Sequence, residues 1–424
     1  MQMDIWPFLA LSLGVTGLVR VLPWGTERQR IVASLLVLLA FMCWAPFVLD
    51  NFRLIQMTRI AAFGLTLIGL NILTGYNGQV SLGHGAFVLM GAYTVAVLLD
   101  RKEQLNLIDA SPWPFWATIF AAGFLAAAAG LVIGVPALRL SGPYLAIATL
   151  AVMISLPIIV RKYGAFTGGS QGIAFSRPPT PPFLEDLLRR EQWMYFLVLL
   201  ALVVMTVLAW NLLRGQFGRA LQAVRDSEVA AAAMGIHVAR VKVLAFVISA
   251  FYAGVAGAFL ALISGIVNPE TVDIVQSINY LAGIVIGGLA SIMGSIIGAA
   301  AIVFIPSDAA NQLAKLPFLD PDMLRRAPGA IQGAVVILVM ILMPYGIAGA
   351  LHRLARLRPE QVLARWREAP AMASQALGRL SWAWDIRPWA RQGPGSNNPK
   401  REVVGHGDGG VKGSNPDEMT KGGQ

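Results

Sequence analysis

The sequence predicts an all-α fold, a polytopic transmembrane helical bundle with about 9–10 membrane segments. Hydrophobic residues make up 56% of its 424 residues and charged residues only 13%, about half the share in an average soluble protein. The charges are also segregated, because residues 60–99 contain no Asp, Glu, Lys or Arg. Apolar stretches of this length are typical of chains that cross a bilayer, which takes about 20 residues per helix.

The net charge of +10 does not indicate nucleic-acid binding. Much of it lies in one loop, residues 214–242, and in the C-terminal tail, where membrane orientation and anionic lipid explain it. The single cysteine, Cys43, excludes an internal disulfide. The four histidines lack ligand spacing, so we expect no metal site. Membrane lipid is therefore an expected partner, and nucleic acid is not.

The chain begins with a predicted transmembrane hairpin, residues 1–53. Its two apolar runs are residues 5–22 and 31–49, and Arg28 and Arg30 lie between them. Residues 5–22 have no basic region before them and no small-residue cleavage site after them, so we expect a retained span rather than a signal peptide.

Residues 60–99 are too long for one crossing, since a single helix would be about 60 Å long. The predicted break is residues 75–85, GYNGQVSLGHG, where four glycines surround Asn77, Gln79, Ser81 and His84. Non-helical backbone inside a bilayer must be buried in protein or line a wet cavity. These four polar residues are therefore candidates for a translocation pathway, with packing groups bonded to neighbouring backbone as the alternative.

Two spans follow, residues 111–138 and 142–160, and then a long loop and a span at residues 193–213. Residues 214–242 carry five Lys or Arg against Asp226 and Glu228, so the positive-inside rule places them in the cytoplasm. Asp226 or Ser227 is predicted to cap a short Ala-rich helix that Gly235 ends. Such a helix suits a partner that applies force, whereas the alternative is a plain connecting loop.

Residues 274–307 form a second long uncharged stretch, with two GxxxG spacings that permit close helix contact. The basic loop and the basic end of the last span, residues 329–350, both belong inside. Residues 274–307 must then return to the side they left, as a re-entrant pair of half-helices. Gly-interrupted segments in both halves point to a midplane pathway, and Gly287 and Gly288 join its candidates. Residues 352–424 are predicted to be a basic cytoplasmic tail, mostly disordered.

Four stretches resemble, in the same order, the permease subunit of branched-chain amino acid ABC importers of the LivM type. They are LNILTGYNGQVSLGHGAF (residues 70–87), LRLSGPYLAIATLA (138–151), GRALQAVRDSEVAAAAMGI (218–236) and IGGLASIMGSIIGA (286–299). The resemblance covers about residues 54–351, which we predict to be the permease core.

The resemblance implies a multi-pass subunit of the bacterial plasma (inner) membrane. It also implies three kinds of partner: a second homologous permease, two cytoplasmic ATPase subunits and a periplasmic or extracellular substrate-binding protein. Residues 226–235 would be the coupling helix that docks on an ATPase. The predicted coupling residues are Arg225, Asp226, Glu228, Ala231 and Gly235. Gly235 follows Glu228 by seven residues rather than six, so the match to the wider EAA-type loop of ABC importers is loose.

The chain contains no Gly-Lys dipeptide and hence no P-loop of the usual form. We therefore expect partner subunits to bind ATP, with no catalytic residue and no cofactor in this chain. The deep membrane stretches also lack Asp, Glu, Lys and Arg for a proton relay. The expected activity is import of branched-chain amino acids. Import of urea, amides or other small solutes by the same architecture is one alternative, and an ion-coupled carrier or channel is another.

Overall fold

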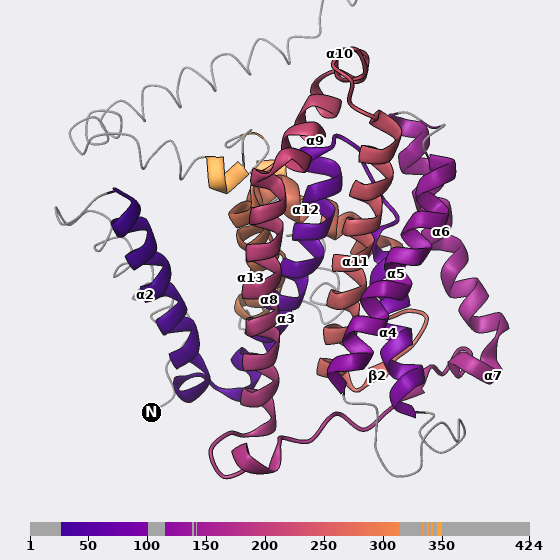
Figure 1. The fold of residues 1–424 in the computed structure, drawn as a ribbon. Helices are drawn as coiled ribbons and strands as arrows, with labels where there is room; N and C mark the ends of the chain where they lie inside the picture. Colours follow the sequence, from indigo (N-terminus) through magenta and orange to yellow (C-terminus); the bar gives the residue numbers. More distant parts are fainter. Residues whose placement is uncertain are drawn as a thin grey trace, which may run out of the picture. The chain divides into compact units, whose positions relative to one another are not determined.

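The computed structural model describes residues 27–100, 115–137, 140, 142–313, 333–334, 337–338, 341 and 346–349 (Figure 1). The predicted first span, most of the last span and the tail from residue 352 lie outside these residues. Five described helices are long and apolar enough to cross a membrane, and four further apolar helices are shorter. This agrees with a multi-pass helical protein, whereas the predicted number of 9–10 membrane segments stays a prediction.

The elements follow the predicted spans closely. The long helices are α2 (Glu27–Val48), α3 (Asn51–Asn71), α4 (His84–Asp100), α5 (Phe115–Ala137), α6 (Pro143–Lys162), α8 (Arg190–Arg214), α11 (Val238–Ser264), α12 (Ile274–Gly287) and α13 (Ile292–Leu313). The short elements are the π-helix η1 (Ile72–Tyr76), α7 (Gly164–Thr167), the 3-10 helix η2 (Pro182–Leu184), α9 (Gln216–Asp226), α10 (Glu228–Ala233), β1 (Ile173–Ala174) and β2 (Ile266–Val267).

Helices α3 and α11 form the centre of the described bundle and are its most buried spanning helices. They approach so closely that a Cβ on Gly69 of α3 would lie 2.9 Å from the carbonyl oxygen of Ser249 in α11. On α11, a Cβ on Gly257 would collide with the carbonyl oxygen of Val88 in α4. Small residues at such positions let helix backbones touch, which is the usual way for helices to associate in lipid.

Both Gly-rich stretches break where the sequence predicts. Helix α3 passes into η1, and α4 begins only at His84. Between α12 and α13, the backbone of Gly283 meets that of Gly298, and Gly287 meets Gly294. Helices α12 and α13 are therefore antiparallel, and the chain returns toward the side from which α12 starts. Helix α12 has half-helix length. The apolar part of α13 is also short, Ile292–Ile305, but its helix is longer than expected because it continues to Leu313.

One small antiparallel ladder was not expected. Ile173 pairs with Val267, and Ala174 pairs with Ile266. It ties the loop after α6 to the end of α11, and an ion pair of 3.1 Å between Arg161 and Glu270 joins the same two segments. Figure 1 shows α7 and β2 at the end of the bundle opposite to α10.

Candidate functional site

The four polar residues predicted in the first break are all buried, with at most 8% of any of them exposed. Asn77 Nδ2 donates to Gln79 Oε1 at 2.8 Å, and the backbone N–H of Gln79 donates to the carbonyl of Leu73 at 3.1 Å. His84 Nε2 lies 3.0 Å from the carbonyl oxygen of Thr66 in α3. The first two bonds lie within the break and η1, and the third joins the start of α4 to α3, which are contacts of the kind that the packing alternative predicts.

Three of these side chains also keep an atom without a partner among the described residues, namely Asn77 Oδ1, Ser81 Oγ and His84 Nδ1. A carbonyl oxygen only accepts, so His84 Nε2 must carry the proton and Nδ1 is an acceptor. Buried polar atoms are normally bonded. Three such atoms in one break are places where water or a passing solute would bond. The pathway role of Asn77, Gln79, Ser81 and His84 stays a prediction.

Asn71, which the sequence reasoning missed, joins the first break to the second. Its Oδ1 accepts the N–H of Ala290 at 2.9 Å. Its Nδ2 donates to the carbonyl of Ser291 and to Ser295 Oγ, each at 2.9 Å. Ala290 has φ 57°, the one positive value at a non-glycine residue in the described chain. A side chain at the end of α3 thus closes the turn between α12 and α13. The available signal was a lone Asn in an apolar membrane stretch.

Gly287 and Gly288 lie in that turn. The backbone of Gly287 packs on Gly294, and Gly288 has φ 118°. Their contacts are those of close helix packing, and a role for either residue in the pathway stays a prediction.

The basic loop is folded as two helices, α9 and α10. Of the two predicted caps, Ser227 is the one used: its Oγ accepts the N–H of Ala230 at 3.2 Å, whereas Asp226 ends α9. Gly235 follows α10 with φ 81°, as expected for a glycine that ends a helix. Helix α9 was not predicted, although its buried Gly218, Leu221 and Val224 are spaced by three residues, which is a helical pattern.

Several predicted coupling residues make contacts with other residues of this chain. Glu228 Oε1 lies 2.6 Å from Lys242 Nζ in α11, and Ala231 is buried. Arg225 Nη1 donates to the carbonyl of Gly75 in the first break at 3.1 Å. Asp226 bonds Arg225 at 3.0 Å and is exposed.

Outward from α10 point two large apolar side chains that were not among the predicted residues. Val229 and Met234 are each 82% exposed. They sit at the two ends of a helix that Ser227 caps and Lys242 holds from behind. Two large apolar side chains are thus exposed at this short helix, one near its start and one directly after its end.

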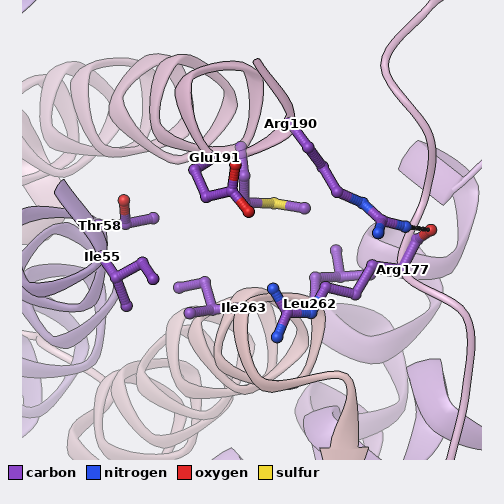
Figure 2. Close-up of a pocket in the computed structure, with 8 residues that line it drawn as sticks. Ile55, Thr58, Arg177, Arg190, Glu191, Leu262 and Ile263 are labelled. Carbon is purple, nitrogen blue, oxygen red and sulfur yellow. Dashed lines mark hydrogen bonds between the residues drawn. The ribbon is translucent and has the colours of Figure 1, made fainter. Parts of the chain in front are cut away.

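At the opposite end of the bundle, α3, α8 and α11 enclose a small cavity between Ile55, Met194 and Ile263 (Figure 2). Figure 2 shows the Arg190 guanidinium reaching the carbonyl of Arg177 beside it. The cavity measures about 20 Å³, enough for about one water molecule. It is not a binding site for a solute as large as an amino acid.

Comparisons with known proteins show the family of this chain. Residues 53–344 match the family described as branched-chain amino acid transport system, permease component. The high-affinity branched-chain amino acid transport system permease protein LivM of Escherichia coli (strain K12) is 33% identical over 344 residues, 76% of each chain. The permease protein LivH of the corresponding system in Salmonella typhimurium is 25% identical and covers 69% of this chain and 93% of its own. No solved structure matches. The chain therefore belongs to the family of permease components of branched-chain amino acid transport systems.

Proposed function

We propose that this chain is the membrane subunit of an ATP-powered importer that moves Leu-, Ile- or Val-like amino acids into a bacterial cell. A second homologous permease completes the passage through the plasma (inner) membrane. Two cytoplasmic ATPase subunits bind ATP, and a substrate-binding protein delivers the solute from outside. The relatives named LivM and LivH support both the cargo and the paired permeases.

The observation that carries the proposal is the exposure of two large apolar side chains at α10. Val229 and Met234 are almost fully exposed on a capped helix in a basic loop, which the positive-inside rule places in the cytoplasm. Large apolar side chains on a rigid element outside the bilayer are typical of a docking surface. An ATPase whose groove receives these two side chains would move α10 when it closes on ATP.

The cargo suits the polar groups in the first break. Asn77, Gln79 and Ser81 offer amide and hydroxyl groups without fixed charge, and His84 offers an acceptor nitrogen. A zwitterionic amino acid has no net charge, so no counter-ion in the chain is needed to carry it. Alternating access would expose these groups first to one side of the membrane and then to the other.

The test is uptake of radiolabelled leucine by proteoliposomes that contain this chain with its second permease and ATPases, supplied with binding protein. Val229→Asp and Met234→Asp should abolish ATP-driven uptake and the co-purification of the ATPases, because a carboxylate would be buried in the docking groove. Val229→Ile and Met234→Leu are the matched controls and should keep both.

Two results would overturn the proposal. One is solute uptake by this chain alone without ATP, which would indicate a carrier or channel. The other is ATP-driven uptake that survives Gly235→Pro combined with Glu228→Arg. Urea and short amides offered beside leucine, isoleucine and valine test the cargo separately, and a preference for urea would reassign it.

A further inference from the structure

Arg225 brings the basic loop into direct contact with the first helix break. Its guanidinium donates to the carbonyl of Gly75, the fourth residue of the π-helix η1. Its aliphatic stem covers Gly78, where a Cβ would lie 2.9 Å from Arg225 Cγ. The other two guanidinium nitrogens, Nε and Nη2, each lie 3.0 Å from Asp226 Oδ1. The Arg225 side chain is therefore fixed to the end of α9 and moves with it.

Asn71 brings the second break to the same place. A Cβ on Gly75 would collide with Asn71 Oδ1 and lie 2.5 Å from the backbone nitrogen of Ala290. Asn71 is 1% exposed and bonds three groups of the α12–α13 turn. Gly75 thus touches Arg225 through its carbonyl and the Asn71–Ala290 pair through its Cα.

We propose that Arg225, Gly75 and Asn71 form a relay through which movement of the coupling loop shifts both helix breaks together. Arg225 and Asn71 are positioning residues in it, since neither needs to contact the solute. The inference rests on the proposed function, because the loop must receive movement from an ATPase. Local π-helix is common at functional sites, and η1 is the point at which the loop meets the membrane core.

The relay sets an order of events along the chain. Movement of α9 reaches the first break through Arg225, and it passes to the turn between α12 and α13 through the hydrogen bonds of Asn71, beside which Gly75 packs on Ala290. Loss of Arg225 should therefore free both breaks from the loop, whereas loss of Asn71 should free only the second.

The experiment measures distances by spin labelling in the complete complex, with and without ATP trapped by vanadate. Cys43→Ser removes the one native thiol. Three exposed positions carry labels, Gln222 on α9, Val80 in the first break and Leu289 in the second, each paired with a label at Ile266 in β2. In the parent protein all three distances should change when ATP is trapped.

In Arg225→Met, the Gln222 distance should still respond, whereas the Val80 and Leu289 distances should not. Arg225→Lys keeps an aliphatic stem and one charged nitrogen that can donate, and should retain part of both responses. In Asn71→Ala, only the Leu289 distance should lose its response. A parent-like Leu289 response in Arg225→Met or in Asn71→Ala would overturn the relay.

If the proposed function fails instead, the distance between the labels at Gln222 and Ile266 in the parent complex will not change when ATP is trapped.

A measurement of transport completes the test. The number of solutes moved per ATP should fall about two- to thirtyfold in both variants, the range of coupling energies carried by such networks. The matched controls are Arg219→Met on α9 and Asn211→Ala on α8, both exposed. They should keep the parent ratio, and an equal loss in the controls would overturn the assignment.

Discussion

The ion pair between Glu228 and Lys242 gives the sharpest prediction about the basic loop, residues 214–242. The Lys242 side chain is 10% exposed and the Glu228 side chain 54%, at a separation of 2.6 Å. Fully exposed pairs contribute about 0.2–1 kcal/mol, whereas removing one partner of a buried pair costs about 3–5 kcal/mol. This pair is buried at one side only. We therefore expect Glu228→Gln to lower the local stability of α10 by about 1–2 kcal/mol.

The measurement is amide hydrogen exchange in the assembled complex. The reporters are the backbone N–H groups of Met234 and Ile236, which donate to Ala230 and Ala231 of α10. A loss of about 1–2 kcal/mol in opening free energy makes them exchange about five to thirty times faster.

A double-mutant cycle separates the pair from the residues themselves. Lys242→Met keeps the length of the side chain and removes its charge, so Glu228→Gln in that background should have little further effect. The control is Glu270→Gln, which breaks an ion pair with Arg161 whose side chains are 80% and 47% exposed. It should leave exchange in α10 unchanged. Additive effects of Glu228→Gln and Lys242→Met would refute the coupling.

Three further predictions concern single positions. Gly257→Ala places a Cβ on the carbonyl of Val88, so thermal unfolding should show that the protein is less stable by about 1–3 kcal/mol. The control is Gly215→Ala, which should be nearly neutral because its Cβ would make only ordinary van der Waals contacts. Gly235→Ala forces an alanine to φ 81° at a cost of about 1–2 kcal/mol, so hydrogen exchange at the end of α10 should quicken, and by less in Gly235→Asn. Ser227→Ala removes the cap of α10 and should cost about 1 kcal/mol, seen as faster exchange at Ala230; unchanged protection there would contradict the assigned cap.

Span positions and both breaks were predictable because they depend on local composition. A charge-free run whose helical length would be twice the bilayer thickness has to turn, and clustered glycines mark the position of the turn. The contact of Asn71 with Ala290 was not predictable, because the two residues are 219 positions apart and nothing in the local sequence pairs them. The ladder of β1 with β2 has two residues per strand, which is too few to leave an alternating pattern.

In the basic loop, residue spacing predicted the helix that is α10 but not the directions of its side chains. Glu228 was expected to meet an ATPase, yet its carboxylate turns back to Lys242. The exposure of Val229, the next residue, was not predictable, because the sequence does not distinguish an exposed apolar residue between two membrane spans from a buried one. Direction depends on which face α11 covers, and only the packed structure supplies that.

The two helices of the basic loop, α9 and α10, differ in the side chains that they bury. Helix α9 buries Leu221 and Val224 and so attaches the loop to the bundle, whereas α10 buries Ala231 and exposes Val229. An isolated helix as short as α10 is unstable in water. Its order must come from the Ser227 cap, from Lys242 and from its junction with α9. Any partner that pushes on α10 therefore transmits force to Lys242 in α11 and, through Arg225, to the end of α3. These are the two most buried spanning helices of the described bundle, so a small movement of the loop acts on the centre of the protein rather than on its rim.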